Sequence, residues 1–386
     1  MSEKLKKGWT RADFGDVVKQ VRDRVDPEST DLERYVAGEH MDSDELRIQR
    51  WGSIGDGYLG PAFHMRFRPG HVLYGSRRTY LRKVAVADFE GITANTTFVL
   101  ETKDPDILLQ EILPFIMQTE SFNNYSIKHS KGSVNPYINF SDLAKYEFAL
   151  PPLEEQRRMN IVISQCYRTI EALKTVSELL MGVRRAMQNE LLFHSDKTKG
   201  SPTALISEIA DINPSDPPLD ENTLFVPMES VTEWKRTIEK FEKRGDRGGI
   251  RAAAGDVLMA RITPCLENGK IAQVPRNVSR CGGSTEFIVF RAKHDTDISF
   301  LYWLVSSDRI RNTAIAMMSG STGRQRVSGS DLGEVRIPRI PYPEQVLKAN
   351  LIDTVELNRE ALTKRLVEAH GLYSSLINNL LGRNEQ

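Results

Sequence analysis

The sequence is poor in cysteine and contains no long apolar run. Its 386 residues include three cysteines, an odd number without a close pair, which excludes a disulfide framework and a structural zinc site of the usual spacing. No stretch approaches the roughly 18 consecutive apolar residues of a membrane-spanning helix, and the N-terminus lacks the apolar segment of a signal peptide. We therefore expect a cytoplasmic protein that does not enter a membrane.

The chain also lacks an excess of either charge, because 52 Lys and Arg balance 52 Asp and Glu. A dedicated nucleic-acid-binding protein is often basic, so such a function would require local basic patches here. The length exceeds the roughly 250 to 300 residues at which a single hydrophobic core stops growing. With 40% hydrophobic residues, the chain has enough apolar side chains for more than one core. The starting expectation is therefore two folded domains.

The common catalytic motifs are missing as well. Gly269–Lys270 is followed by Ile271, so there is no Walker phosphate loop, and no His-Glu-x-x-His zinc motif occurs. One catalytic alternative is a nuclease site made of Asp88, Glu101 and Lys103, in which carboxylates would hold Mg²⁺. The equivalent positions in the second half of the chain do not repeat this triplet, which favours a solvated strand end.

The most informative feature that is present is an internal repeat. Ser141–Leu143 recurs as Ser330–Leu332, and Glu155–Gln156 recurs as Glu344–Gln345, both at the same offset along the chain. Before each repeat of the Glu–Gln pair, short apolar runs bounded by Gly, Asp and Asn indicate strands and turns. A helix is predicted among them at Asp106–Thr119. The sequence therefore predicts two related halves.

Each half ends in a long helical segment that begins at a proline cluster, where proline and carboxylates are favoured in the first turn. Apolar residues then recur at seven-residue steps. In the first segment they are Cys166, Leu173, Leu180 and Met187, with Ile163, Ile170, Val176 and Val183 interleaved; in the second they are Val355, Leu362, Ala369 and Leu376, with Ile352, Leu366, Tyr373 and Leu380.

A helix of roughly 40 residues spans on the order of 60 Å and needs another helix to cover its apolar stripe. Halves related by a pseudo-twofold axis would pair these helices antiparallel. We therefore predict an α+β fold in which two pseudo-symmetric α/β domains, 1–150 and 196–340, are separated by two long antiparallel coiled-coil helices, 151–195 and 341–386. Ordinary core-facing helices of one large domain are the alternative.

Basic side chains gather in two segments of each half, interleaved with aromatic and small polar residues. Arginine can neutralise phosphates or pair with guanine O6 and N7. The candidate DNA contacts are Arg66, Arg77, Arg78, Tyr80, Arg82, Lys83, Lys128 and Lys131 in the first half, and Arg261, Lys270, Arg280, Arg324 and Arg326 in the second. Solvated surface loops are the alternative. The residues differ between the halves, so the two domains are expected to recognise different things.

The start of the first long helix carries a family resemblance. The segment Pro151–Arg157, followed by a helix that ends in Gln188–Phe193, resembles a conserved region of the DNA-specificity subunits of Type I restriction-modification enzymes. The copy that begins at Pro341–Gln345 resembles the second conserved region of the family, with Tyr342–Pro343 in place of Pro–Leu and Val346 at the position equivalent to Arg157.

The resemblance implies a subunit without catalytic activity. Each of the two α/β domains would be a target-recognition domain that reads one half of a bipartite site in double-stranded DNA, and the helices would set the gap. Two DNA adenine methyltransferase subunits would dock on the helix starts, and restriction and translocase subunits would join the assembly. S-adenosylmethionine, ATP and Mg²⁺ are expected on these partner subunits, with no cofactor on this chain. The candidate partner contacts are Glu154, Glu155, Gln156, Arg157, Glu344 and Gln345. Besides the nuclease, a scaffold that does not contact DNA is the remaining alternative.

Overall fold

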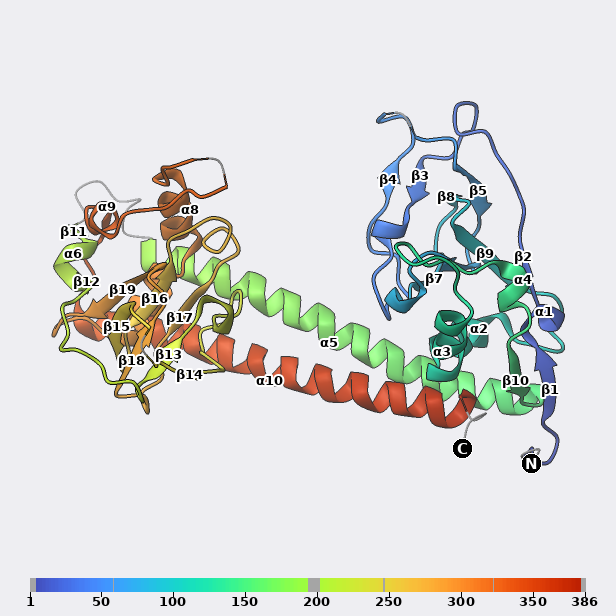
Figure 1. The fold of residues 1–386 in the computed structure, drawn as a ribbon. Helices are drawn as coiled ribbons and strands as arrows, with labels where there is room; N and C mark the ends of the chain where they lie inside the picture. The colour runs from blue at the N-terminus through green and yellow to red at the C-terminus, as the bar shows by residue number, and fades with distance from the viewer. Residues whose placement is uncertain (1–4, 58, 194–201, 246, 322, 383–386) are drawn as a thin grey trace. The chain divides into compact units, whose positions relative to one another are not determined.

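The computed structural model describes residues 5–57, 59–193, 202–245, 247–321 and 323–382 (Figure 1). The chain divides into two compact units, Met1–Leu173 with Arg365–Gln386, and Lys174–Lys364. The domain boundaries predicted near 150 and 340 coincide with changes of secondary structure, whereas each compact unit also includes part of each long helix. The boundary predicted at 195 lies outside the described residues.

The described residues of the first unit form two four-stranded sheets and one two-stranded sheet. Their strand orders are β2-β9-β6-β7, β4-β3-β8-β5 and β1-β10. Strand β3 pairs with β8 in parallel, and the other named pairs are antiparallel. The strands are β1 (Thr10–Asp13), β2 (Val18–Gln20), β3 (Arg34–Val36), β4 (Gly52–Ser53), β5 (Phe63–Phe67), β6 (Val72–Gly75), β7 (Val84–Val86), β8 (Gly91–Ala94), β9 (Thr97–Thr102) and β10 (Glu147–Leu150).

Short helices connect these strands: α1 (Phe14–Val17), η1 (Gly38–His40), η2 (Thr79–Leu81), η3 (Gln110–Ile112), α2 (Leu113–Gln118), α3 (Glu120–Lys128) and α4 (Phe140–Leu143). The predicted helix at Asp106–Thr119 is therefore shorter and starts later. Asp104 accepts a hydrogen bond from the backbone of Asp106 and closes a turn there, and Pro114 is tolerated only because it falls in the first turn of α2. Thr119 is extended and caps α3, a second helix that the sequence analysis missed.

The second unit repeats this topology strand for strand. Its sheets have the orders β12-β19-β16-β17, β14-β13-β18-β15 and β11-β20, and β13 pairs with β18 in parallel. The predicted pseudo-symmetry is thus confirmed. The elements are β11 (Thr203–Leu205), α6 (Ile206–Ile209), β12 (Ala210–Ile212), β13 (Leu224–Val226), η5 (Met228–Ser230), β14 (Glu242–Lys243), β15 (Ile250–Ala253), β16 (Val257–Ala260), β17 (Ile271–Gln273), β18 (Arg280–Gly283), β19 (Phe287–Ala292), α7 (Ile298–Val305), α8 (Asp308–Ala316), α9 (Gly329–Gly333) and β20 (Arg336–Pro338).

The two long helices are α5 (Leu153–Phe193) and α10 (Tyr342–Leu381), close to the predicted ranges. In the first unit, Met159 of α5 lines the same groove as Leu380 of α10, while Tyr167 further along α5 lies 5.9 Å, ring to ring, from Tyr373. Residue numbers rise along one helix as they fall along the other, so the segments are antiparallel there. In the second unit Arg184 of α5 meets Glu356 of α10 at 3.6 Å. No helix in the described part of the chain is both long and apolar enough to cross a membrane.

The hydrophobic core of each unit includes side chains of both long helices. In the first unit, Ile163 and Ile170 of α5 and Ile377 of α10 belong to the same buried cluster as the sheet and helices α2 and α3. Figure 1 shows α2 and α3 beside the C-terminal part of α10. In the second unit, Leu192 and Ile352 pack in the cluster that contains α7. Both long helices therefore contribute buried side chains to the hydrophobic core of each unit.

The predicted apolar rows of α5 need one correction. Ile163 and Ile170 are buried, but Val176 and Val183 have 43% and 47% of their surface exposed, so their assignment to the seam is wrong. Spacings of three and four residues carry the buried face from Ile170 to Arg184, which is 4% exposed. The sequence pattern selected Val183 because the buried neighbour is charged.

Candidate nucleic-acid interface

In the first unit, the loop that follows β6 and the loop between α3 and α4 are held together, and we call them loop pair 1 (residues 75–83 and 129–139). Lys131 and Tyr137 exchange two backbone hydrogen bonds of 2.7 and 2.9 Å across the second loop. Arg78 donates its backbone N–H to the carbonyl of Pro136 at 2.6 Å, and Ile138 donates to Ser76 at 3.0 Å. The two basic segments predicted from the sequence thus form one surface.

The second unit builds the same arrangement from loop pair 2, which consists of residues 260–270 and 317–328, with residue 322 outside the described part. Ser319 and Arg326 exchange backbone hydrogen bonds of 3.0 and 2.9 Å. Thr263 donates to Gln325 at 3.1 Å, and Val327 donates to the carbonyl of Arg261 at 3.0 Å. Arg326 stands at the repeat position of Tyr137, so the frame is repeated while the side chains differ.

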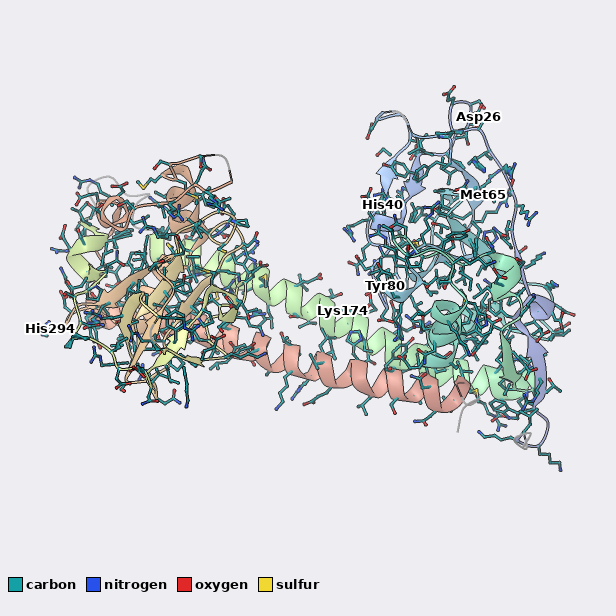
Figure 2. All side chains as sticks on the ribbon, viewed as in Figure 1. Asp26, His40, Met65, Tyr80, Lys174 and His294 are labelled. Carbon is teal, nitrogen blue, oxygen red and sulfur yellow. The ribbon has the colours of Figure 1, made fainter. Side chains whose placement is uncertain are left out.

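Five of the predicted contacts project into solvent from these loops or beside them. Arg78 has a φ of 50° and caps η2 from the left-handed region, which turns the chain sharply before Tyr80. Tyr80, labelled in Figure 2, has 52% of its surface exposed. A backbone held in place with exposed cationic and aromatic side chains suits contact with phosphates and bases. The exposed candidates are Arg77, Arg78, Tyr80, Lys128 and Arg324.

Other predicted contacts are engaged by the protein itself. Arg82 pairs with Asp44 at 2.8 Å and with Glu120 at 2.6 Å, which ties loop pair 1 to α3. Arg66 lies on β5 and pairs with Glu90 at 2.6 Å. Lys83, Lys270 and Arg280 donate to the backbone carbonyls of Gly38, Met228 and Pro217, respectively. Each of these five side chains thus makes at least one contact within the protein.

The remaining three predicted contacts lie inside the loop pairs. Two of them pair with an acidic side chain of the protein, and the third is half-buried. Lys131 is exposed and pairs with Asp142 at 2.7 Å, and this hydrogen bond raises the pKa of Lys131 and lowers the pKa of Asp142. Arg326 forms a two-point contact with Glu286. Arg261 is half-buried, and its Nε has no hydrogen-bond partner among the described residues.

The sequence analysis missed two residues of this surface, Tyr137 in loop pair 1 and Glu286, which directly precedes β19 and contacts loop pair 2. Tyr137 is 41% exposed and lies between the backbones of Arg77 and Lys131. An exposed aromatic residue beside basic residues was the signal that selected Tyr80, and the same signal would have selected Tyr137. Glu286 had no such signal, because an isolated acidic residue at the start of a strand does not indicate a partner in a distant loop.

The residues of the nuclease alternative have separate contacts. Glu101 pairs with Lys19 at 2.9 Å and lies 3.5 Å from the ring of His71, while the ammonium group of Lys103 donates to the carbonyl of Gly15. Within the described residues, no three His, Cys, Asp or Glu side chains are grouped in a way that would hold a metal ion. The arrangement therefore gives the nuclease hypothesis no support.

At the start of each long helix, a buried glutamine joins the helix to the domain before it. Gln156 accepts a hydrogen bond from the backbone of Leu109 at 2.9 Å and donates to Ile107 and Pro151, both at 2.8 Å. Gln345 makes the equivalent three bonds to Asp297, Asp295 and Ile340. Both side chains are buried, so neither is presented to a partner; they position the helix instead.

The predicted partner contacts around these glutamines are more accessible. Arg157 is exposed, Glu154 forms an exposed pair with Arg158 at 2.7 Å, and Glu344 lies 3.6 Å from Lys348. Glu155 is half-buried and accepts a hydrogen bond from the indole of Trp9 at 2.7 Å. Of the predicted partner contacts, Glu154, Arg157 and Glu344 are therefore the accessible charges.

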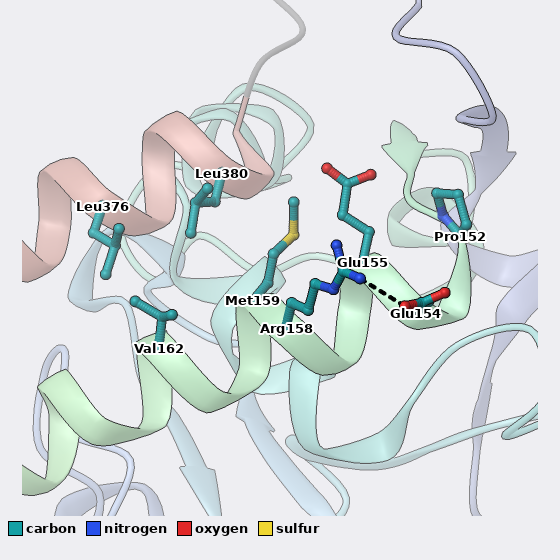
Figure 3. A pocket seen from close by; sticks show the side chains of 8 residues that line it. All are labelled: Pro152, Glu154, Glu155, Arg158, Met159, Val162, Leu376 and Leu380. Atoms are coloured by element: carbon teal, nitrogen blue, oxygen red, sulfur yellow. Dashed lines mark hydrogen bonds and ion pairs between the residues drawn. The ribbon is translucent and has the colours of Figure 1, made fainter.

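A groove of roughly 560 Å³ opens beside the start of α5 in the first unit. Figure 3 shows Met159 and Val162 of α5 facing Leu376 and Leu380 of α10, with the ion pair of Glu154 and Arg158 at one end. The groove combines an apolar floor with charged walls. These two kinds of surface are typical of the centre and the rim of a protein interface.

The buried glutamine gives a test of the helix start. Gln156→Ala would leave the backbone groups of Ile107, Leu109 and Pro151 without their partner, and a buried polar group left unpaired costs about 1–3 kcal/mol. We expect Gln156→Ala to lower the free energy of unfolding by at least that amount in urea denaturation. Glu154→Ala is the control, because an exposed ion pair contributes about 0.3–0.5 kcal/mol. Equal stability of the two variants would contradict the assigned role of Gln156.

Comparison with known proteins agrees with the arrangement. Residues 58–180 match the model of the Type I restriction modification DNA specificity domain. The Escherichia coli type I restriction enzyme EcoEI specificity subunit is 28% identical over 232 residues, which cover 56% of this chain and 39% of the relative. The EcoAI specificity subunit of the same organism is 30% identical over 191 residues, covering 46% of this chain and 31% of the relative. The matches thus span well under half the length of these curated relatives.

Two solved structures share the fold over nearly the whole chain. The type I restriction-modification S subunit of M. genitalium aligns with a TM-score of 0.59 and 14% identity, and a chain from a study of the assembly of a type I R-M system aligns with a TM-score of 0.56 and 21% identity. Each alignment covers 98% of both chains. Residues 58–180 thus match the type I restriction-modification DNA specificity domain, and the chain as a whole shares the fold of the solved S subunits.

Proposed function

We propose that this chain is the non-catalytic DNA-recognition subunit of a type I restriction-modification complex. Each target-recognition domain reads one half of a bipartite site in double-stranded DNA, and α5 and α10 set the gap. The observation that carries the proposal is the repeated frame of loop pairs 1 and 2, which presents different side chains at equivalent positions. A repeated frame with divergent side chains suits two readers of different sequences.

The proposal also assigns the chemistry to other subunits. Two DNA adenine methyltransferase subunits dock at the helix starts, through Glu154, Glu155, Arg157 and Glu344 and the groove in the first unit, and restriction and translocase subunits join them. S-adenosylmethionine, ATP and Mg²⁺ belong to those partners. The balanced charge of this chain, 52 basic against 52 acidic residues, is compatible with partners that supply much of the phosphate-binding charge. A cytoplasmic location, predicted from the sequence, is consistent with a DNA substrate.

The direct test of this function is methylome sequencing of cells that express the chain with its methyltransferase partner. We expect a single bipartite methyladenine motif with a fixed gap. Methylation without sequence preference would contradict the proposal. Incubation of the isolated chain with Mg²⁺ and DNA separates the nuclease alternative, since we expect no cleavage. A footprint of the assembled complex separates the scaffold alternative, since we expect two protected blocks.

A second test addresses the loop residues. Arg78→Gln and Arg324→Gln are expected to weaken the binding of cognate DNA by the assembled methyltransferase while subunit assembly stays intact. If either arginine contacts a phosphate, the slope of log K against log salt falls by about 0.9 for that contact. Arg50→Gln is the matched control, because Arg50 is exposed but pairs with Asp42 outside the loop pairs. Unchanged affinity in both loop variants would remove these two assignments.

A further inference from the structure

Arg326 of loop pair 2 contacts Glu286, which directly precedes β19, and this contact differs from the other basic contacts of the surface. Nε of Arg326 donates to both carboxylate oxygens of Glu286, at 2.9 and 3.2 Å, and Nη2 donates at 2.7 Å. The side chains remain 43% and 27% exposed, respectively. The contact lowers the pKa of Glu286 and raises that of Arg326, so both groups keep their charge. This is an accessible guanidinium held in one orientation.

The backbone of Arg326 is held as firmly as its side chain. It exchanges hydrogen bonds with Ser319, and the neighbouring Val327 donates to Arg261, whose own N–H donates to Glu286 at 2.9 Å. Hydrogen bonds thus join loop pair 2, the start of β19 and the side chains of Arg326 and Glu286 to one another. A donor that is fixed before binding loses less conformational freedom when it meets its target.

The charge of the pair argues against a phosphate contact. A carboxylate beside an arginine weakens the attraction of that arginine for a phosphate, because the two charges of the pair cancel and the carboxylate repels the phosphate. A base edge is neutral and carries acceptors, so directional N–H groups remain useful there. Glu286 occupies the Nε side of the guanidinium, which leaves the edge formed by Nη1 and the second N–H of Nη2 directed away from the carboxylate.

We infer that Arg326, oriented by Glu286, is a base-reading residue of the second target-recognition domain and takes a guanine in its half-site. The free edge of the guanidinium presents two parallel N–H groups, which match the O6 and N7 acceptors of guanine in the major groove. This inference rests on the proposed function and adds the base that one domain requires. Arg326 contacts the base, and Glu286 is a positioning residue.

The first target-recognition domain does not repeat the pair. The equivalent positions in the first half of the chain hold Tyr137 in place of Arg326 and Thr97 in place of Glu286. Tyrosine and threonine offer a single hydroxyl each and cannot form a bidentate pair with guanine. We therefore expect a guanine to be required at one position of one half-site, the one that the second target-recognition domain reads.

The experiment uses the complex of the full chain with its methyltransferase subunits and DNA duplexes that carry the wild-type motif. Each guanine of the motif is replaced in turn by 7-deazaguanine, which lacks the N7 acceptor, or by adenine in a matched base pair. For the wild type, adenine at one position is expected to weaken binding by roughly 5- to 150-fold, the range for one bidentate contact. At the same position, 7-deazaguanine should weaken binding by a smaller factor.

Variants then assign the position. Arg326→Lys keeps the charge but not the two parallel donors, so it should abolish the preference for guanine there and keep the preferences elsewhere. Glu286→Gln should reduce the same preference only. Arg339→Lys is the matched control and should leave every base preference intact, because Arg339 is an exposed arginine of the second unit that pairs with Glu208 outside loop pair 2. Thermal unfolding of each complex separates loss of folding from loss of readout.

Two results would overturn the inference: retention of every guanine preference by Arg326→Lys, or an equal loss at all positions together with a lower unfolding temperature, which marks a purely structural pair. Failure of the proposed function looks different, because the wild-type complex would then bind or methylate DNA without any motif. The two outcomes are therefore distinguishable from the wild-type data alone.

Discussion

Replacement of Glu356 by alanine is expected to lower the free energy of unfolding of the second unit by about 3–5 kcal/mol, the usual cost of removing one partner from a buried ion pair. The side chains of Glu356 and Arg184 are each 5% exposed, and that of Arg359 is 11% exposed. Glu356 accepts a hydrogen bond from Nε of Arg359 at 3.0 Å, and its carboxylate lies 3.6 Å from Nε of Arg184. Without it, two buried guanidinium groups lose their shared carboxylate.

Urea denaturation followed by circular dichroism measures this loss. Glu178→Ala is the matched control, since Glu178 is an exposed helical residue of the same unit and its replacement should change stability by less than about 0.5 kcal/mol. The triple variant Arg184→Met, Glu356→Leu, Arg359→Met removes the three charges together. It should be about as stable as the wild type. Similar stability of Glu356→Ala and Glu178→Ala would rule out an energetic role for the buried triad of Arg184, Glu356 and Arg359.

The triad also specifies how the helices pair. Its repeat equivalents in the first unit are Tyr167 for Glu356 and Tyr373 for Arg184, whose rings lie 5.9 Å apart. A helix shifted by one heptad would bury Arg184 or Arg359 without Glu356, at a large desolvation cost. A polar group at one position of a coiled coil fixes its register in the same way.

The long helices were the most predictable part of the fold, because their apolar periodicity and proline-marked starts are local properties of the chain. The exception lies at the triad. A pattern that counts apolar residues cannot predict that Arg184 is buried, since the burial depends on Glu356, which belongs to the other long helix. The same limit explains why Val183 was assigned to the seam although it is exposed.

The candidate interface was predictable in part for a similar reason. Runs of Arg, Lys, Tyr and Gly marked both loops of each pair, and the repeat indicated that they are equivalent. Which cations are free depends on distant carboxylates. Arg82 is engaged by Asp44 and Glu120, and Arg326 by Glu286, whereas Arg77 is exposed. Tertiary partners of this kind leave no periodic signal.

Trp303→Ala is expected to destabilise the second unit by about 3–5 kcal/mol, the range for removal of a buried tryptophan side chain. Trp303 lies on α7 without exposed surface. Its indole N–H donates to Asp353 of α10 at 2.7 Å, and its backbone carbonyl accepts a hydrogen bond from Gln188 of α5 at 3.0 Å. The guanidinium of Arg236 lies 5.4 Å from the ring and also donates to Asp353. One residue thus joins α7 to both long helices.

Trp303→Phe separates the two parts of this contribution. It keeps most of the apolar surface and removes the donor to Asp353, so we expect a smaller loss of about 1.5–3 kcal/mol, the range for a hydrogen bond to a charged group. Trp51→Ala is the control, because Trp51 is 44% exposed and its replacement should cost far less. Stability of Trp303→Ala within about 1 kcal/mol of the wild type would contradict the anchoring role, since that change is small for a fully buried tryptophan. Since loop pair 2 belongs to the same unit, DNA affinity should fall only at temperatures where this unit begins to unfold.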